Sequence, residues 1–147
     1  MLCQSIPGDS MVILFAALPG SQVHGANFIL GALEKGATAI LTDAEGAALA
    51  RDALATSDAA LIVAQDPRQT LAQTASLWFG SHPGTVVAVT GTNGKTSVST
   101  FCRQMWEIMG LAGVNLGTTG VEGVWSYPLN HTTPEPITLH RVLAEAE

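Results

Sequence analysis

Short apolar runs alternate with longer stretches of helical spacing through the first half of the chain. The runs lie at 12–18, 38–41 and 60–64, and the stretches at 28–35 and 45–55 separate them. Strands that are buried on both faces read as continuous apolar runs, and the helices that connect them cover the sheet. The sequence therefore predicts an α/β fold built from βα units around a parallel sheet.

Residues that start and stop helices stand at the ends of these stretches. Asn27 can cap the helix at 28–35, and Gly36 can end it. Asp66 and Pro67 mark another helix start, because Asp accepts hydrogen bonds from free amides and Pro suits the first helical position. Three apolar side chains of that helix share one face, and we expect them to be buried: Leu71, Ala75 and Trp78.

A break in the pattern divides the chain. Residues 80–84, with the sequence GSHPG, cannot continue a helix, so we predict one domain at 1–83 and a second at 84–147. The pattern then restarts as a strand at 85–90, a helix from Lys95 that ends at Gly110, a strand at 112–116 and a final helix at 137–146. The helix from Lys95 carries an apolar face at helical spacing: Val98, Phe101, Cys102, Met105 and Met109.

The composition excludes several classes of protein. With 47% hydrophobic and 12% charged residues among 147, the chain can fill a core and is not disordered. Twelve acidic residues outnumber six scattered basic ones, so nucleic-acid binding is not expected. The apolar run at 11–18 is too short for a membrane span, and residues 1–10 lack the Lys or Arg of a secretory signal. Cys3 and Cys102 show no metal or disulfide pattern, which indicates a reducing, cytoplasmic location.

A glycine-bearing loop before the helix at Lys95 is the most informative motif. Gly91 and Gly94 let backbone amides approach phosphate oxygens, because neither residue has a Cβ. The helix N-terminus favours an anion, Lys95 would neutralise the terminal phosphates, and the Thr96 hydroxyl would complete a Mg²⁺ shell. We name residues 91–97 the phosphate loop and predict that it binds a nucleotide; the alternative is a glycine turn followed by a solvated lysine.

The phosphate loop resembles the ATP loop of the Mur ligases, the enzymes that build the peptide of peptidoglycan precursors. Further segments are similar to the same family: 14–20 (LFAALPG), 25–28 (GANF), 35–39 (KGATA), 117–120 (GTTG) and 131–140 (HTTPEPITLH). The last of these resembles the MurE type, the tripeptide synthetase. Together the segments extend over about residues 12–147.

The resemblance implies an ATP-dependent amide ligase with a small N-terminal βα uridine-nucleotide domain, followed by the start of a P-loop (Rossmann-like) ATP-binding domain. Such an enzyme uses ATP and Mg²⁺ to phosphorylate the carboxylate of UDP-N-acetylmuramoyl-L-alanyl-D-glutamate. A diamino acid, meso-diaminopimelate or L-lysine, then attacks the acyl phosphate. The implied setting is peptidoglycan synthesis in the cytoplasm.

The resemblance also implies site residues. Seven would hold the ATP phosphates, with Lys95 catalytic and Thr96 on Mg²⁺: Gly91, Thr92, Asn93, Gly94, Lys95, Thr96 and Ser97. Three match positions that contact the uridine nucleotide, and three match positions that contact the muramoyl substrate: Ser21, Gln22 and Val23, then His131, Thr132 and Thr133. The alternatives are a polar loop at 21–22 and ordinary turn or cap chemistry at 132–133. For His24, His82 and His140 we expect a surface or capping role.

Family enzymes are much longer than this chain. We therefore expect an N-terminal fragment that is inactive by itself, with 84–147 the less stable half, because a P-loop strand and helix expose apolar surface without the rest of their sheet. Two other classes of function stay open. One is a nucleotide-binding module that needs a partner chain to supply the missing domains. The other is an unrelated P-loop kinase or ligase of small molecules.

Overall fold

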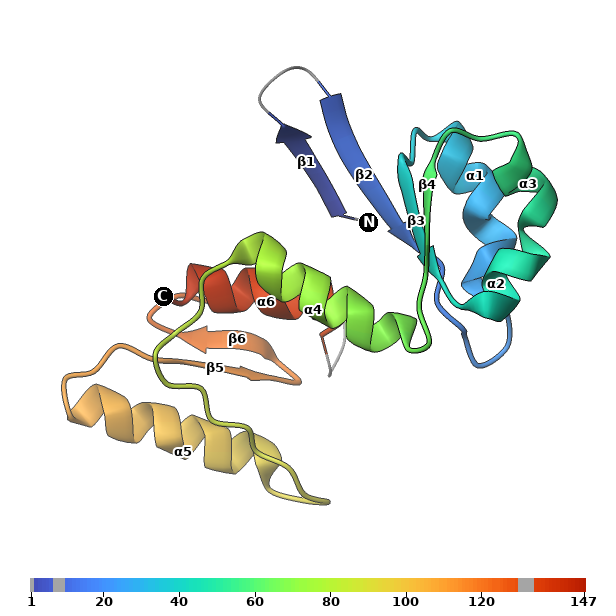
Figure 1. Ribbon diagram of the computed structural model, residues 1–147. Helices are drawn as coiled ribbons and strands as arrows, with labels where there is room; N and C mark the ends of the chain where they lie inside the picture. Colours follow the sequence, from blue (N-terminus) through green and yellow to red (C-terminus); the bar gives the residue numbers. More distant parts are fainter. Residues whose placement is uncertain (1, 7–9, 130–133) are drawn as a thin grey trace. The chain divides into compact units, whose positions relative to one another are not determined.

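A computed structural model describes residues 2–6, 10–129 and 134–147, with side chains from residue 12 onward. The chain divides into two compact units, Met1–Thr74 and Ala75–Glu147, which we call unit 1 and unit 2. Each unit combines helices and strands, and unit 1 contains a mainly parallel sheet (Figure 1). The predicted α/β class, with a parallel sheet, is confirmed.

The sheet of unit 1 has four strands in the order β1-β2-β3-β4. Their bounds are Leu2–Ile6 for β1, Ser10–Ala16 for β2, Ala39–Thr42 for β3 and Ala60–Val63 for β4. The three strands β2, β3 and β4 are parallel, with Leu14 opposite Ala39 and Ala39 opposite Ala60. β1 pairs antiparallel with β2 and was not predicted, because its five residues of mixed polarity form a strand only through that pairing.

The helices of unit 1 differ from the prediction in two places. A 3₁₀ helix η1 (Gly25–Phe28) precedes α1 (Ile29–Glu34), and His24 rather than Asn27 is the capping residue. The helix expected at 45–55 is divided at Ala50 into α2 (Ala44–Leu49) and α3 (Arg51–Ala55). The buried Ala50 belongs to the core, so packing outweighs the helix propensity of this Ala-rich segment.

The core of unit 1 lies between the sheet and the helices α1, α2 and α3, which lie together beside β3 and β4 in Figure 1. It consists of small and branched aliphatic residues: Ile13, Ala17, Ala26, Ile29, Ala32, Ala37, Ile40 and Ala50. β4 is an edge strand of this sheet, and its apolar side chains are 43–52% exposed at Leu61, Ile62 and Val63. Because β2, β3 and β4 are parallel, their carboxyl ends lie together along one side of the sheet, which we call its carboxyl edge. The connecting loops emerge from this carboxyl edge.

The helix α4 (Pro67–Phe79) confirms the predicted start at Asp66 and Pro67. The Asp66 carboxylate accepts a hydrogen bond of 2.9 Å from the Gln69 amide. Leu71 and Ala75 are buried and Trp78 is partly buried, as their shared face predicts. No helix among the described residues is long and apolar enough to cross a membrane.

Beyond the end of α4, the described part of unit 2 contains two helices and a hairpin. Its elements are α5 (Lys95–Ile108), β5 (Val114–Gly117), β6 (Gly120–Gly123) and α6 (Pro136–Glu145). The strand predicted at 112–116 begins two residues later and ends one residue later than expected, and its antiparallel pairing with β6 was not predicted. The turn between them needs glycine, because Gly120 has a φ of +111° and a Cβ there would lie 2.5 Å from the Tyr127 carbonyl.

The strand prediction at 85–90 is wrong. Residues 85–90 are not a strand, and Val86 and Val87 are 59% and 56% exposed. A strand requires a partner backbone, and the strands that the structure describes do not pair with this segment. The apolar face of α5 is exposed, in line with the apolar surface expected on a P-loop helix without the rest of its sheet: Val98, Phe101, Met105 and Met109 are 47–61% exposed.

Candidate functional site

The phosphate loop connects the segment 85–90 to the start of α5. Gly91 and Gly94 have φ values of +146° and +77°, which side chains with a Cβ rarely adopt. Gly94 is the N-cap of α5, and no side chain among the described residues caps it. The amides of the first turn of α5 are therefore available to an anion, and the helix dipole favours negative charge there.

Lys95 is folded back across the phosphate loop. Its Nζ donates hydrogen bonds to the carbonyls of Gly91 and Thr92, the second over 3.5 Å. The ammonium group is thus held against the loop although the residue is exposed. A positive charge and the free amides of α5 lie at the same end of the helix, which is an arrangement that suits a phosphate.

Thr96 lies close to a second segment of unit 2. Its hydroxyl oxygen is 3.4 Å from that of Thr118, in the turn between β5 and β6. Thr118 has no role that could be assigned from the sequence, although the segment 117–120 carries part of the resemblance. Hydroxyl oxygens suit Mg²⁺, and among the described residues no group of His, Cys, Asp or Glu could hold a metal. Here a Mg²⁺ ion would depend on Thr96, on phosphate oxygens and on water.

A second candidate site is loop 19–24, which follows β2 at the carboxyl edge of the sheet. Ser21, Gln22 and Val23 lie together in it and are exposed. The Gly25 amide donates a 2.9 Å hydrogen bond to the Leu18 carbonyl and closes the base of the loop. A Cβ at Gly25 would lie 2.8 Å from the Leu18 backbone, so only glycine permits this closure.

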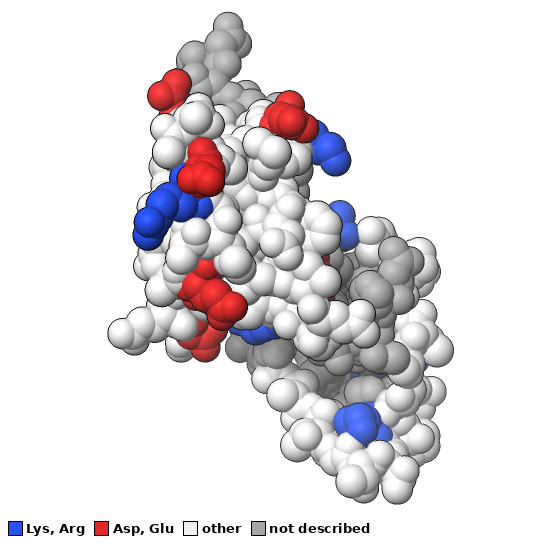
Figure 2. All heavy atoms as spheres, turned by 90° about the vertical axis from the view of Figure 1, so that its right-hand side faces the viewer, with Lys and Arg blue, Asp and Glu red and all other residues white. Residues whose placement is uncertain are grey.

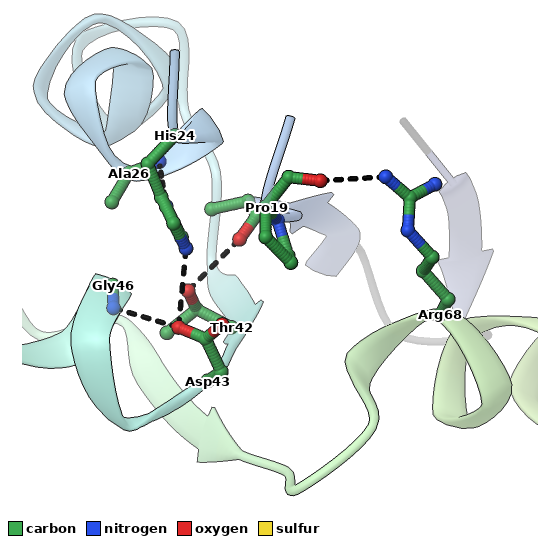
Figure 3. Close-up of polar contacts among 8 residues, drawn as sticks. Pro19, His24, Ala26, Thr42, Asp43, Gly46 and Arg68 are labelled. Carbon is green, nitrogen blue, oxygen red and sulfur yellow. Dashed lines mark hydrogen bonds and ion pairs between the residues drawn. The ribbon is translucent and has the colours of Figure 1, made fainter. Parts of the chain in front are cut away.

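Loop 19–24 is held at its C-terminal end by His24 (Figure 3). The His24 Nδ1 atom accepts a 3.0 Å hydrogen bond from the Ala26 amide, so the ring hydrogen is on Nε2, which donates to Asp43 over 3.1 Å. The same Asp43 oxygen accepts a 2.7 Å hydrogen bond from the Gly46 amide and caps α2. His24 is therefore a capping residue, as expected, and its partner Asp43 could not be found from sequence spacing.

The pKa of Asp43 lies below its ordinary value. The hydrogen bond from the Gly46 amide is the largest cause, burial opposes it, and the hydrogen bond and charge of His24 lower the pKa further. The carboxylate form is therefore the one that the fold stabilises.

Arg68 holds the other end of loop 19–24. Its Nη2 donates a 2.6 Å hydrogen bond to the Pro19 carbonyl from the first turn of α4 (Figure 3). On the face drawn in Figure 2 the Lys and Arg side chains lie as separate groups rather than as one patch.

His131, Thr132 and Thr133 lie outside the described residues. Glu135, in the described segment 134–147, caps α6 by accepting hydrogen bonds from the amides of Ile137 and Thr138 at 2.9 and 3.0 Å. A cavity of about 250 Å³ lies beside this cap. Its lining consists of Tyr127, Pro128, Leu129, Pro134, Glu135, Thr138 and Arg141.

Comparison with known proteins gives matches to two family models. The model described as Mur ligase family, catalytic domain, matches residues 9–79. The model described as Mur ligase middle domain matches residues 89–147. Loop 19–24 lies within the first match, and the whole phosphate loop lies within the second.

Curated relatives carry one name, UDP-N-acetylmuramoyl-L-alanyl-D-glutamate–2,6-diaminopimelate ligase. The relative from Brucella melitensis is 44% identical over 145 residues, and that from Rhizobium meliloti is 43% identical over 141 residues. Both alignments cover 95% of this chain but only 28% and 26% of the relatives. The chain thus spans about a quarter of the length of the curated relatives it matches. With matches to both of its domain models, the chain belongs to the Mur ligase family.

Proposed function

We propose that this chain carries the ATP-phosphate loop and the uridine-nucleotide loop of an ATP-dependent amide ligase. The ligase would join meso-diaminopimelate to the D-glutamate carboxylate of UDP-N-acetylmuramoyl-L-alanyl-D-glutamate. The names of the relatives favour diaminopimelate over L-lysine. We place the reaction in the cytoplasm, where ATP and nucleotide-linked sugars are available.

One observation carries the proposal: Lys95 folds back over the phosphate loop beside the uncapped N-terminus of α5. The free amides would hold the β- and γ-phosphates, and the Lys95 ammonium would offset the charge that develops as the γ-phosphoryl group moves to the carboxylate. Mg²⁺, when bound, would supply further positive charge at the same phosphates. The Thr96 hydroxyl would face that ion, with Thr118 beside it.

The two domains predicted from the sequence divide the substrates in this proposal. Residues 1–83 would bind the uridine nucleotide through Ser21, Gln22 and Val23. Residues 84–147 would begin the ATP-binding domain and would contact the muramoyl substrate through His131, Thr132 and Thr133. The exposure of residues 21–23 at the carboxyl edge of a parallel sheet supports the first assignment, because ligands of α/β proteins bind at that edge.

Calorimetric titration of the purified chain with ATP and Mg²⁺ tests the proposal. The variant Lys95→Ala should weaken ATP binding at least about tenfold, since it removes a charge-assisted contact to phosphate. Lys35→Ala is the matched control, because Lys35 is the only other lysine and lies at the end of α1. Lack of ATP binding by the unaltered chain, or equal binding by Lys95→Ala, would overturn the assignment of the phosphate loop.

Turnover separates the remaining alternatives. ADP release that requires both the UDP-muramoyl dipeptide and diaminopimelate supports the ligase. ADP release with an unrelated small-molecule acceptor, but not with the dipeptide, supports another P-loop enzyme. Turnover that appears only when a second chain is added supports a module that acts with a partner.

A further inference from the structure

We propose that the hydrogen bond between His24 and Asp43 positions loop 19–24 and thereby sets the affinity of the chain for a uridine nucleotide. This inference rests on the proposed function, which assigns Ser21, Gln22 and Val23 to that nucleotide. His24 and Asp43 are positioning residues in this scheme, because they act through the loop rather than through contact with the ligand.

The loop has an exposed tip and a fixed base. Residues 20–23 are exposed, whereas the base is closed by the hydrogen bond between Gly25 and Leu18. The Val23 carbonyl turns back toward Gly20, where a Cβ would lie only 2.4 Å from it. A loop that is ordered before the ligand arrives loses less conformational entropy on binding, and so binds more tightly.

His24 fixes the exposed tip of the loop, residues 20–23, to the rest of unit 1. It follows Val23 directly, and only 9% of its side chain is exposed. One ring nitrogen binds the Ala26 amide at the start of η1, and the other binds Asp43, which lies between β3 and α2. The end of the tip is thus tied to an element 19 residues away, at the carboxyl edge of the neighbouring strand.

Asp43 is itself held in place for this contact. The Gly46 amide donates to the same carboxylate oxygen that His24 contacts, and 22% of the Asp43 side chain is exposed. A Cβ on Gly46 would lie 2.6 Å from His24 Cε1 and 2.0 Å from Thr42 Oγ1. Glycine is unfavourable inside a helix, so its presence in α2 fits a requirement for space around the pair.

Two substitutions of His24 each keep one of the two hydrogen bonds that its ring makes and remove the other. In His24→Asn the shorter side chain can still cap by accepting from the Ala26 amide, but it does not reach Asp43. In His24→Gln the longer amide can still donate to Asp43, but the local cap is lost. The matched control is His82→Asn, because His82 is exposed and lies in unit 2.

The measurement is calorimetric titration of each full-length variant with UDP, followed by titration with ATP and Mg²⁺, with thermal unfolding recorded for each. We expect His24→Asn to weaken UDP binding about tenfold, from the loss of a hydrogen bond to a charged group. His24→Gln should recover most of this affinity, and His82→Asn should leave it unchanged. ATP binding, which belongs to unit 2, should stay the same in all three.

A double-substitution cycle tests the pairing itself. If Asp43 acts through His24, then adding His24→Asn to Asp43→Ala should weaken UDP binding no further than Asp43→Ala alone. Additive losses would overturn the inference, as would unaltered UDP binding in a folded His24→Asn variant or an equal loss of ATP binding. Failure of the unaltered chain to bind UDP would instead overturn the nucleotide assignment of the proposed function, and this inference with it.

Discussion

The Thr42 hydroxyl donates a 2.9 Å hydrogen bond to the carbonyl of Ala17, and both residues are fully buried. Thr42 is the last residue of β3, and Ala17 lies one residue beyond β2. The Ala17 amide in turn donates to the Leu41 carbonyl at 2.8 Å. This side-chain contact therefore extends the pairing of two parallel strands to the point where loop 19–24 begins (Figure 3).

Thr42→Val should destabilise the chain by about 1–3 kcal/mol. Valine has the shape of threonine but no hydroxyl, so the buried Ala17 carbonyl would lose this donor. Urea unfolding provides the measurement. Thr56→Val is the control, because the Thr56 hydroxyl is exposed at the end of α3 and its loss should change the stability by less than about 0.5 kcal/mol. Equal effects of the two substitutions would show that the buried Thr42 hydrogen bond stabilises the fold no more than the exposed hydrogen bond of Thr56 does.

Gly46→Ala should destabilise the chain by about 1–3 kcal/mol, although alanine is the better helix former. The added Cβ would overlap Thr42 Oγ1 at 2.0 Å and the His24 ring at 2.6 Å. Gly31→Ala is the matched control inside α1, where a Cβ meets nothing within 4 Å, so that substitution should stabilise by about 0.5–1 kcal/mol. Opposite signs in thermal unfolding are the expected result. Stabilisation by both would mean that the space around the pair is not required.

The stability that Asp43 contributes should depend on pH. Its pKa is lower in the folded chain than in the unfolded chain, where an Asp titrates near about 3.9. The contribution is therefore fully present above that value and is lost as the pH falls toward and through the folded pKa. The difference in unfolding free energy between the unaltered chain and Asp43→Asn should be constant near about pH 6 and should shrink below about pH 4. A difference that does not change with pH would contradict this assignment.

Glu135→Ala should loosen the start of α6. Burial alone raises the pKa of Glu135, but the hydrogen bonds from the Thr138 hydroxyl and from the amides of Ile137 and Thr138 outweigh burial and hold the pKa below its ordinary value. Loss of an N-cap costs about 1 kcal/mol. Hydrogen exchange at the Ile137 and Thr138 amides should accelerate in this variant. Glu145→Ala, at the exposed end of the same helix, is the control and should leave those two amides unchanged.

Local sequence signals predicted the elements whose stability is local. The helix start at Asp66 and Pro67 is correct because the Asp66 side chain binds an amide three residues away. The start of α5 at Lys95, and its end at Ile108 shortly before Gly110 with a φ of +76°, follow from the same kind of short-range chemistry. The phosphate loop was recognisable for the same reason, since its glycines, lysine and threonine are contiguous.

Pairing between segments that are distant in the sequence could not be predicted from local patterns of residue types. The strands β1 and β6 exist through their partners, and residues 85–90 form no strand although their apolar run resembles one. The cap at His24 was assigned to Asn27, because the residue types alone favour Asn. The choice depends on Asp43, which only the fold brings within 3.1 Å of the His24 ring.

The sequence by itself determined the α/β class, the starts of α4 and α5 and the family, and it predicted the phosphate loop, because each depends on residues that are neighbours in the chain. Tertiary structure alone decided that Thr118 lies beside Thr96, that Arg68 holds Pro19 and that His24 pairs with Asp43. These contacts join residues 19 to 49 positions apart. Their geometry follows from how strands pair and helices pack, and no local pattern of residue types encodes it.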